Sequence, residues 1–223
     1  MTWIKICGTT NEGDADVCIR AGANALGFIM TASPRQVTDI AAYSIGTIVP
    51  KGVETIGVFV NEGVETLVQT ARFCKFTGVQ LHGEEDANYV SELRKLLPRV
   101  RILKAVNPEA LANATGIKPD AWLIDSGRGA QRGGTGKLFN WSSAQPLLKK
   151  LREPVIIAGG LNAQNVQHAL ETLQPWGVDV VSGVEAYPGR KHPGLIAQFI
   201  DAVRQFDARM SARKLSAQRG QRP

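Results

Sequence analysis

Short runs of β-branched and other apolar residues alternate with longer amphipathic stretches along this chain. The runs predict eight strands, near residues 4–7, 25–29, 55–60, 78–81, 101–105, 121–125, 155–158 and 178–181. The amphipathic stretches predict helices near residues 14–21, 39–48, 64–75, 86–97, 108–114, 143–151, 163–173 and 195–206. Strict strand–helix alternation is typical of βα units and a parallel sheet. We therefore expect a single α/β domain that forms a closed (β/α)8 TIM barrel, with an open doubly wound sheet as the alternative.

Two acid/base candidates stand at the ends of predicted strands. Cys7 ends the run Trp3–Cys7 and precedes Gly8, and Asp125 ends the run Ala121–Asp125. Barrel enzymes place their catalytic groups at the carboxyl ends of the strands, so the pattern indicates an acid/base site. A small buried cysteine and a carboxylate that caps its own loop are the alternative interpretations.

Glycine clusters follow the last three predicted strands. They lie at residues 133–137, at Gly159 and Gly160, and at Ser182 and Gly183. The loops after the seventh and eighth strands of such barrels often bind phosphate through backbone N–H groups, which indicates a barrel of the phosphate-binding type. Glycines that only form tight turns are the alternative. Residues 127–137 predict a long loop beside the site, and the chain carries neither a Walker A loop nor a dinucleotide-binding glycine motif.

The excess positive charge gathers at the C-terminal end. The net charge is +6 at pH 7, and without the five basic residues after position 208 the body carries about +1. We expect the barrel to occupy residues 1–207 and residues 208–223 to form a flexible, disordered basic tail. A nucleic-acid arm is the alternative, but no aromatic residue interleaves these charges, so we expect no nucleic-acid partner.

Cysteine usage and hydropathy exclude several other classes. Three cysteines without a C-x-x-C spacing argue against a disulfide framework and against a cysteine-based zinc site. No window reaches the length of a membrane span, and the first residues lack a signal pattern. We therefore expect a cytoplasmic protein with no membrane partner.

Several short motifs occur in a fixed order along nearly the whole body. The most specific are Lys5–Gly8 (KICG), Gln80–Gly83 (QLHG) and Ser182–Glu185 (SGVE). Others lie at residues 25–28, 33–35, 57–60, 123–126, 133–136, 158–161 and 177–181. On these motifs the chain resembles the phosphoribosylanthranilate isomerase family of tryptophan biosynthesis.

The resemblance implies an Amadori rearrangement carried out by an aldose–ketose isomerase. N-(5′-phosphoribosyl)anthranilate becomes 1-(2-carboxyphenylamino)-1-deoxyribulose 5-phosphate, with no cofactor and no metal. Asp125 is then the general acid that protonates the ribose ring oxygen, and the ring opens to a Schiff base. Cys7, as a thiolate, is the general base that removes the proton from the ribose C2 carbon.

The resemblance also implies the binding residues. Arg35 is expected at the anthranilate end of the substrate, and His82 and Asp179 are expected to line the same mouth. The phosphate is expected on Gly159, Gly160, Ser182 and Gly183. A surface arginine, a packing histidine and an ion-paired aspartate remain the alternatives for the first three residues. The family implies a monomer or a homodimer with a small phosphorylated substrate as its partner.

The chain departs from the family pattern in places. His192 stands where the family usually has an acidic residue, and Thr9 replaces the commoner isoleucine. The segment of residues 30–34 is shorter than the family pattern leads us to expect before Arg35. Two alternatives follow: a paralogous isomerase that acts on another aminophosphoribosyl compound, and a non-catalytic protein that binds a phosphate ligand on the same barrel. The similar isomerase of histidine biosynthesis is expected to use two aspartates, and Cys7 argues against it.

Overall fold

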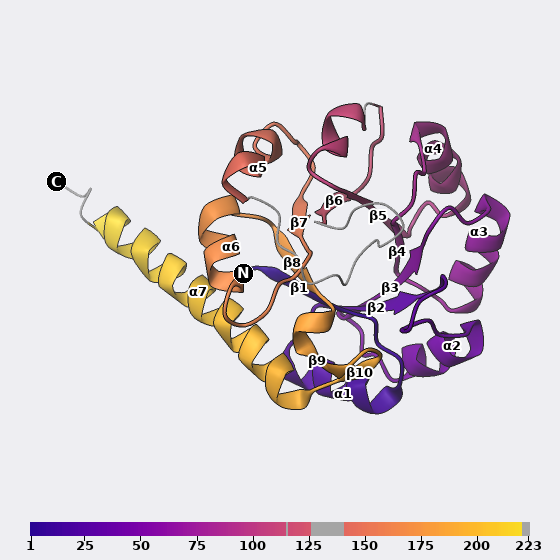
Figure 1. Cartoon of the computed structure of the whole chain (residues 1–223), viewed down its shortest axis with the longest axis horizontal. Coiled ribbons are helices and arrows are strands. Elements are labelled where there is room, and N and C mark those ends of the chain that lie inside the picture. Colours follow the sequence, from indigo (N-terminus) through magenta and orange to yellow (C-terminus); the bar gives the residue numbers. More distant parts are fainter. Residues whose placement is uncertain (115, 126–140, 220–223) are drawn as a thin grey trace.

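Eight parallel strands close into a barrel in the computed structural model, which describes residues 1–114, 116–125 and 141–219. Each strand pairs with the next in chain order, and β8 pairs with β1 to close the ring (Figure 1). The predicted barrel is therefore confirmed. The strands are β1 Trp3–Cys7, β2 Ala25–Ile29, β3 Glu54–Phe59, β4 Gly78–Leu81, β5 Arg101–Val106, β6 Ala121–Ile124, β7 Val155–Ile157 and β8 Gly177–Val180.

Helices surround the barrel, and most predicted helices are confirmed to within a few residues at their ends (Figure 1). Side-chain caps define several of their starts, since the Asn11 side chain accepts from the Asp14 amide and the Asp86 side chain accepts from the Tyr89 amide. The helices are α1 Glu12–Ala21, α2 Asp39–Thr47, α3 Val64–Phe73, α4 Ala87–Leu96, α5 Trp141–Leu148, α6 Val166–Leu173 and α7 Pro193–Arg219.

The strands are buried on both faces, which divides the core into two parts. Side chains that alternate along each strand face the helices on one side and the barrel axis on the other. On β1, for example, Ile4 and Ile6 belong to the outer core between sheet and helices, whereas Trp3 belongs to the inner cluster. The same alternation turns Lys5 and Cys7 inward, so the barrel interior is apolar near Trp3 and polar toward the carboxyl ends of the strands.

The predicted helix at residues 108–114 is wrong. The structure has only a 3₁₀ turn there, η1 Ala110–Asn113, between β5 and β6. The Asn107 side chain accepts a hydrogen bond from the Ala110 amide at 2.6 Å and folds the chain into a turn. The segment is too short to repay the cost of starting an α-helix, and Gly116 follows it with φ of 80°.

A short hairpin follows β8 and was not predicted. After the 3₁₀ turn η2 (Ser182–Val184), β9 (Glu185–Tyr187) pairs antiparallel with β10 (Arg190–Lys191). The next residue, His192, accepts hydrogen bonds through Nδ1 from the amides of Gly194 and Leu195, at 3.1 and 3.3 Å. His192 therefore caps the start of α7, a role that an acidic side chain also fills well.

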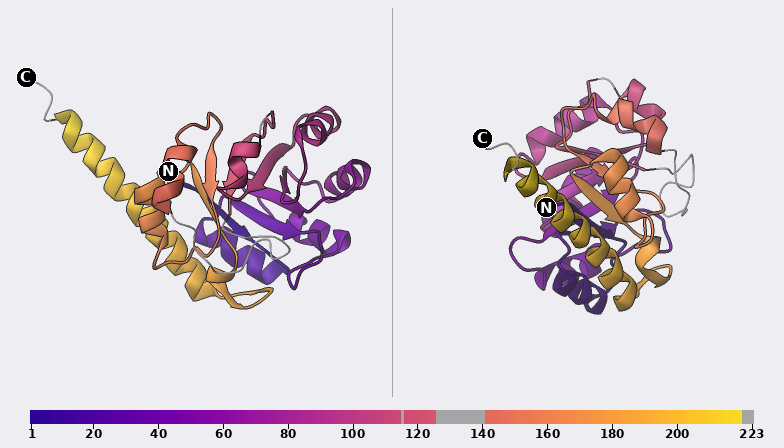
Figure 2. Two further views of the ribbon diagram at one scale, coloured as in Figure 1. Left: turned by 45° about the horizontal axis from the view of Figure 1, so that its top comes forward. Right: turned by 90° about the vertical axis from the view of Figure 1, so that its left-hand side faces the viewer.

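The last helix differs from the expected flexible tail. Helix α7 runs from Pro193 to Arg219 and extends well past the barrel (Figure 2). The segment after Asp207 is rich in alanine, arginine and other helix-forming residues and has no glycine or proline before Gly220, so nothing in it stops the helix. The base of this extension is anchored, because Asp207 accepts hydrogen bonds from the amide and the hydroxyl of Thr2. Residues 220–223 lie outside the described residues.

The long loop expected at residues 127–137 also lies outside the described residues. Within the described part of the chain, no helix combines the length and the apolar composition that crossing a membrane requires.

We expect deletion of residues 212–223 to move the midpoint of thermal unfolding by no more than about 2 °C, because exposed surface residues contribute little to stability. The described side chains in that range, Ala212, Arg213 and Ser216, are exposed. Phe206→Ala is the contrasting variant: Phe206 is buried, and its truncation is expected to cost about 3–5 kcal/mol. Thermal melts followed by circular dichroism compare the two. A fall in the unfolding midpoint of the deletion variant as large as that of Phe206→Ala would contradict the expectation.

Candidate active site

Cys7 lies at the carboxyl end of β1 beside a buried ion pair. Lys5, two residues earlier on the same face, is fully buried, and its Nζ lies 2.9 Å from Oδ1 of Asp179 on β8. Lys5 and Asp179 are direct register partners, as are Cys7 and Gly27 on β2. A β-carbon at Gly27 would lie 2.5 Å from the Cys7 sulfur and 3.0 Å from Lys5 Nζ, so a glycine is needed there. This arrangement puts a thiol, an ammonium and a carboxylate at one place in the barrel mouth.

The pKa values of these groups follow from their burial and their neighbours. Burial raises the pKa of the Cys7 thiol, while the positive charge of Lys5 acts in the opposite direction. Burial alone would lower the pKa of Lys5, but Asp179 and Cys7 together raise it above its usual value. Lys5 is therefore a permanent buried cation at neutral pH.

His82 and Asp125 meet at the ends of β4 and β6. His82 Nε2 lies 3.9 Å from Oδ2 of Asp125, and the Gln80 side-chain amide donates to His82 Nδ1 at 2.8 Å. Burial, followed by the positive charge of Lys5, lowers the pKa of His82 to about 4. With Nδ1 as the acceptor, a neutral imidazole carries its proton on Nε2, the nitrogen that faces Asp125.

A second buried ion pair holds the loop that follows His82. Lys104 on β5 lies 2.8 Å from Glu85, and both side chains are almost completely buried. Glu85 also accepts hydrogen bonds from the amides of Asn61 and Gly83, and Lys104 donates to the Gly83 carbonyl. These bonds tie the ends of β3, β4 and β5 together and fix the backbone just beyond His82.

Arg35 reaches the mouth from the loop between β2 and α2. Its aliphatic stem covers Gly8, where an added β-carbon would lie 2.9 Å from Arg35 Cδ. Its guanidinium binds both oxygens of Glu185 on β9, at 2.7–3.0 Å. Lys191 on β10 binds Glu185 as well, and its Nζ also donates to the carbonyl of Cys7. Although burial acts to raise it, the pKa of Glu185 is lowered by these two cations.

The two glycine loops predicted to hold phosphate lie against each other at the ends of β7 and β8. Gly159 and Gly160 both have positive φ, at 81° and 68°, and a β-carbon at Gly183 would collide with the carbonyl oxygen of Leu161. Asn165 braces the first loop, since its side chain donates to the Gly160 carbonyl and accepts from the Asn162 amide. Helix α6 consequently starts at Val166, three residues later than predicted, because Asn162 closes a turn there instead.

Within the described residues, the backbone N–H groups of Gly159, Gly160, Ser182 and Gly183 donate to no acceptor. Four amides without partners in two glycine loops at one end of a barrel form the kind of concave site that binds an anion.

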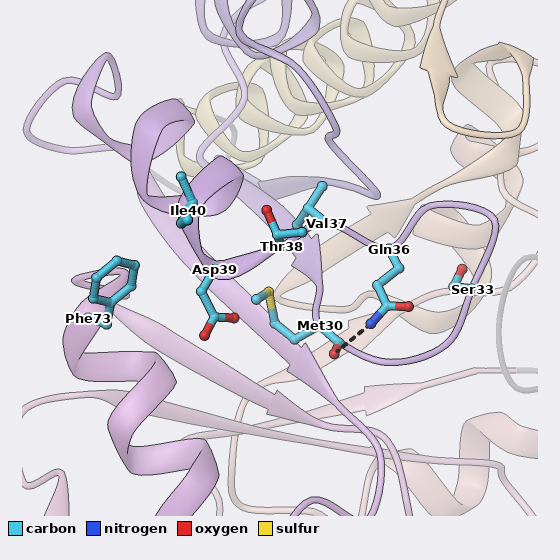
Figure 3. Close-up of a pocket in the computed structure, with 8 residues that line it drawn as sticks. All are labelled: Met30, Ser33, Gln36, Val37, Thr38, Asp39, Ile40 and Phe73. Atoms are coloured by element: carbon cyan, nitrogen blue, oxygen red, sulfur yellow. Dashed lines mark hydrogen bonds between the residues drawn. The ribbon is translucent and has the colours of Figure 1, made fainter.

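A separate pocket of about 850 Å³ lies outside this mouth. It is lined by Met30, residues 36–40 and Phe73, and Figure 3 shows the Gln36 side chain donating to the Met30 carbonyl. That hydrogen bond joins the two ends of the loop that carries Arg35. None of the predicted site residues lines this pocket.

Comparisons with known proteins agree on one family. The family model described as N-(5′-phosphoribosyl)anthranilate (PRA) isomerase matches residues 4–202. The chain belongs to the phosphoribosylanthranilate isomerase family. The chain is 41% identical to N-(5′-phosphoribosyl)anthranilate isomerase of Pelobacter propionicus, over 90% of this chain and 94% of the relative.

Solved structures of the family superimpose closely on the barrel. The isomerase of Thermotoga maritima aligns with a TM-score of 0.81 at 36% identity, over 92% of this chain and 100% of that one. A structure of phosphoribosylanthranilate isomerase in complex with reduced 1-(o-carboxyphenylamino)-1-deoxyribulose 5-phosphate aligns with a TM-score of 0.78 at 34% identity over the same shares. The thiamine phosphate pyrophosphorylase of Pyrococcus furiosus, at 17% identity, shares the fold alone.

Sequence reasoning gave no role to three charged residues that lie at the mouth. Lys5 and Glu185 were noted only as parts of the KICG and SGVE motifs, and Lys191 was not singled out. Lys5 could have been found, since a lysine two residues before a buried cysteine on a barrel strand must face the same interior. Glu185 and Lys191 become partners only through the hairpin after β8.

We expect His82 to make folding stability fall with acidification. Its pKa is 6.5 in the unfolded chain and about 4 in the folded one, so below pH 6.5 the unfolded state binds the proton first. The contribution of the neutral imidazole to the free energy of unfolding is fully present above pH 6.5. It is lost as the pH falls toward 4, by about 3 kcal/mol relative to a His82→Gln variant. Urea unfolding of both proteins between these two pH values measures the difference. A constant difference would contradict the buried, neutral imidazole.

Proposed function

We propose that this chain converts N-(5′-phosphoribosyl)anthranilate into 1-(2-carboxyphenylamino)-1-deoxyribulose 5-phosphate, as an aldose–ketose isomerase of tryptophan biosynthesis. The family match over residues 4–202 carries this proposal. The barrel mouth supports it, because a thiol, a carboxylate and two glycine loops converge there.

Asp125 and Cys7 are the proposed acid and base. Asp125 protonates the ribose ring oxygen, the C1–oxygen bond breaks, and the ring opens to an iminium at C1. The iminium withdraws electrons from C2, so Cys7 as a thiolate removes the C2 proton and the bonding pair forms the C1–C2 double bond of an enolamine. Tautomerisation of the enolamine then gives the ketone. Cys7 ends β1 and Asp125 directly follows β6, and these strands lie apart in the ring, so each group can approach a different side of the sugar.

Arg35 is the proposed ligand of the anthranilate carboxylate. Its Nε and one terminal nitrogen are committed to Glu185, and within the described residues its other terminal nitrogen donates to nothing. Glu185 thereby fixes the guanidinium plane while one edge stays available to a second carboxylate. The phosphate is proposed to lie on the backbone amides of Gly159, Gly160, Ser182 and Gly183, which donate to no acceptor among the described residues.

His82 and Asp179 are proposed to orient the site. The lowered pKa of His82 keeps the imidazole neutral, which suits hydrogen bonding beside Asp125 more than proton transfer at neutral pH. Asp179 is 4% exposed, and its ion pair with Lys5 supports the alternative of an ion-paired aspartate over a direct substrate ligand.

The remaining expectations stay predictions. These are a cytoplasmic location, a monomer or homodimer, the absence of a nucleic-acid partner, and the division of the chain into a barrel at residues 1–207 and a flexible basic tail at residues 208–223. A paralogous isomerase and a non-catalytic phosphate-binding protein are the functions that the following assay distinguishes from the proposed one.

We expect Cys7→Ala and Asp125→Asn each to lower kcat by about 10²–10⁴-fold, the usual contribution of a general base or acid. The assay generates phosphoribosylanthranilate in situ from anthranilate and follows its fluorescence as the enzyme consumes it. Cys18→Ala is the matched control, because Cys18 is buried between α1 and the barrel and lies outside the mouth. Consumption of the substrate by Cys7→Ala at the wild-type rate would reject Cys7 as the general base. A folded wild-type protein without activity would reject the proposed isomerase function.

We expect Gly183→Ala to raise KM about tenfold or more and to change kcat less, because loss of binding shared by ground and transition states appears in KM. The added methyl would force the two glycine loops apart at Leu161. Gly46→Ala is the matched control, since the nearest atom to its added β-carbon lies 3.7 Å away. An unchanged KM together with an altered kcat would place the phosphate elsewhere.

A further inference from the structure

A buried lysine lies beside the proposed base and has no role in the chemistry described above. We propose that Lys5 is a positioning residue whose ammonium group stabilises the thiolate form of Cys7, while Asp179 holds that ammonium in place. The inference rests on the proposed function, in which Cys7 must act as a thiolate.

The geometry brings the two groups close together. Both side chains project from β1 toward the barrel interior, and both approach the space left by the missing side chain of Gly27. A β-carbon at Gly27 would lie 2.5 Å from Cys7 Sγ and 3.0 Å from Lys5 Nζ, so the sulfur and the nitrogen are no more than 5.5 Å apart. Opposite charges within about 4–6 Å favour each other's charged forms.

Burial makes the interaction strong. Lys5 is 0% exposed and Cys7 is 3% exposed, so little water screens the charges between them. A buried thiol is ordinarily inert, since the thiolate loses its hydration. The burial that raises the pKa of Cys7 therefore has to be opposed by a nearby cation if Cys7 is to remove a proton.

Three charged groups act on Cys7, and Lys5 acts most strongly among them. Lys5 lowers the pKa of the thiol, the Asp179 carboxylate raises it, and Lys191 lowers it. Lys191 donates to the Cys7 carbonyl, the Val181 carbonyl and Glu185, so its charge is already balanced by other partners. Within the part of the chain that the structure describes, the Asp179 side chain pairs with Lys5 alone, at 2.9 Å.

A purely structural role is the competing explanation. The Lys5–Asp179 pair joins the first and last strands of the barrel, and breaking it leaves one buried charge without a partner. A single Lys5 variant is then destabilised whatever its effect on Cys7. The double variant Lys5→Met/Asp179→Asn removes both charges together and keeps side chains of similar size, so it provides the folded protein for the test.

The first experiment titrates the Cys7 thiol directly. The ultraviolet absorbance of the thiolate is followed against pH in the double variant and in the parent, both carrying Cys18→Ala and Cys74→Ala. The same proteins with Cys7→Ser supply the background at every pH. We expect the midpoint for Cys7 to rise by about one to three pH units in the double variant. An unchanged or lower midpoint in a folded double variant would overturn the inference.

The second experiment is the pH profile of kcat/KM. We expect the double variant to lose about tenfold or more at pH 7 and to recover toward the parent at higher pH, where its thiolate forms. A loss that is constant at all pH values would indicate a structural role only and would overturn the inference. The titration needs no turnover, so the two proposals can fail separately: activity retained by Cys7→Ala rejects the base, whereas an unmoved thiol midpoint rejects the role of Lys5.

Discussion

The ion pair between Lys5 and Asp179 is the constraint on which the rest of the mouth depends. It lies where β1 and β8 meet, and both of its side chains are almost completely buried. A buried charge without its partner typically costs a protein about 3–5 kcal/mol, so each group fixes the place of the other. Because Cys7 follows Lys5 by two residues on the same strand, the position of the thiol is fixed by the same pair. The contact between β1 and β8 that closes the barrel therefore also positions the proposed base.

Other ion pairs fix side chains and loops elsewhere around the mouth. The Lys104–Glu85 pair fixes the backbone beyond His82, and Glu185 between Arg35 and Lys191 joins the β2 loop to the hairpin after β8. Each charge in these pairs faces an opposite charge, so the mouth contains many charged groups whose side chains have little freedom to move. Site residues held in this way by rigid strands and braced loops suit a reaction that needs an acid and a base in fixed places.

Much of the fold could be predicted from the sequence because its local signals agree with its tertiary structure. Short apolar runs became strands buried on both faces, and capping residues such as Asn11 and Asp86 mark real helix starts. The helix at residues 108–114 failed because a single side chain, Asn107, closes a turn that hydrophobic spacing does not reveal. At the C-terminal end, charge and composition indicated a flexible tail, whereas the structure continues α7 to Arg219 because the alanines and arginines there favour a helix. In the mouth, strand ends located Cys7 and Asp125, but the pairing of Lys5 with Asp179 depends on barrel closure across 174 residues.

That closure also bears on how the chain folds as it leaves the ribosome. Strand β1 is synthesised first, yet one of its two neighbours, β8, ends only at Val180, and the hydrogen bonds of Thr2 cannot form until Asp207 has been synthesised. Until then β1 has an unpaired edge, and Lys5 lacks its counter-charge. Contacts between such distant parts of a sequence form slowly, because the intervening chain must first be ordered. The nascent barrel therefore passes most of its synthesis with an open edge and an exposed Cys7, the residue that the finished barrel buries.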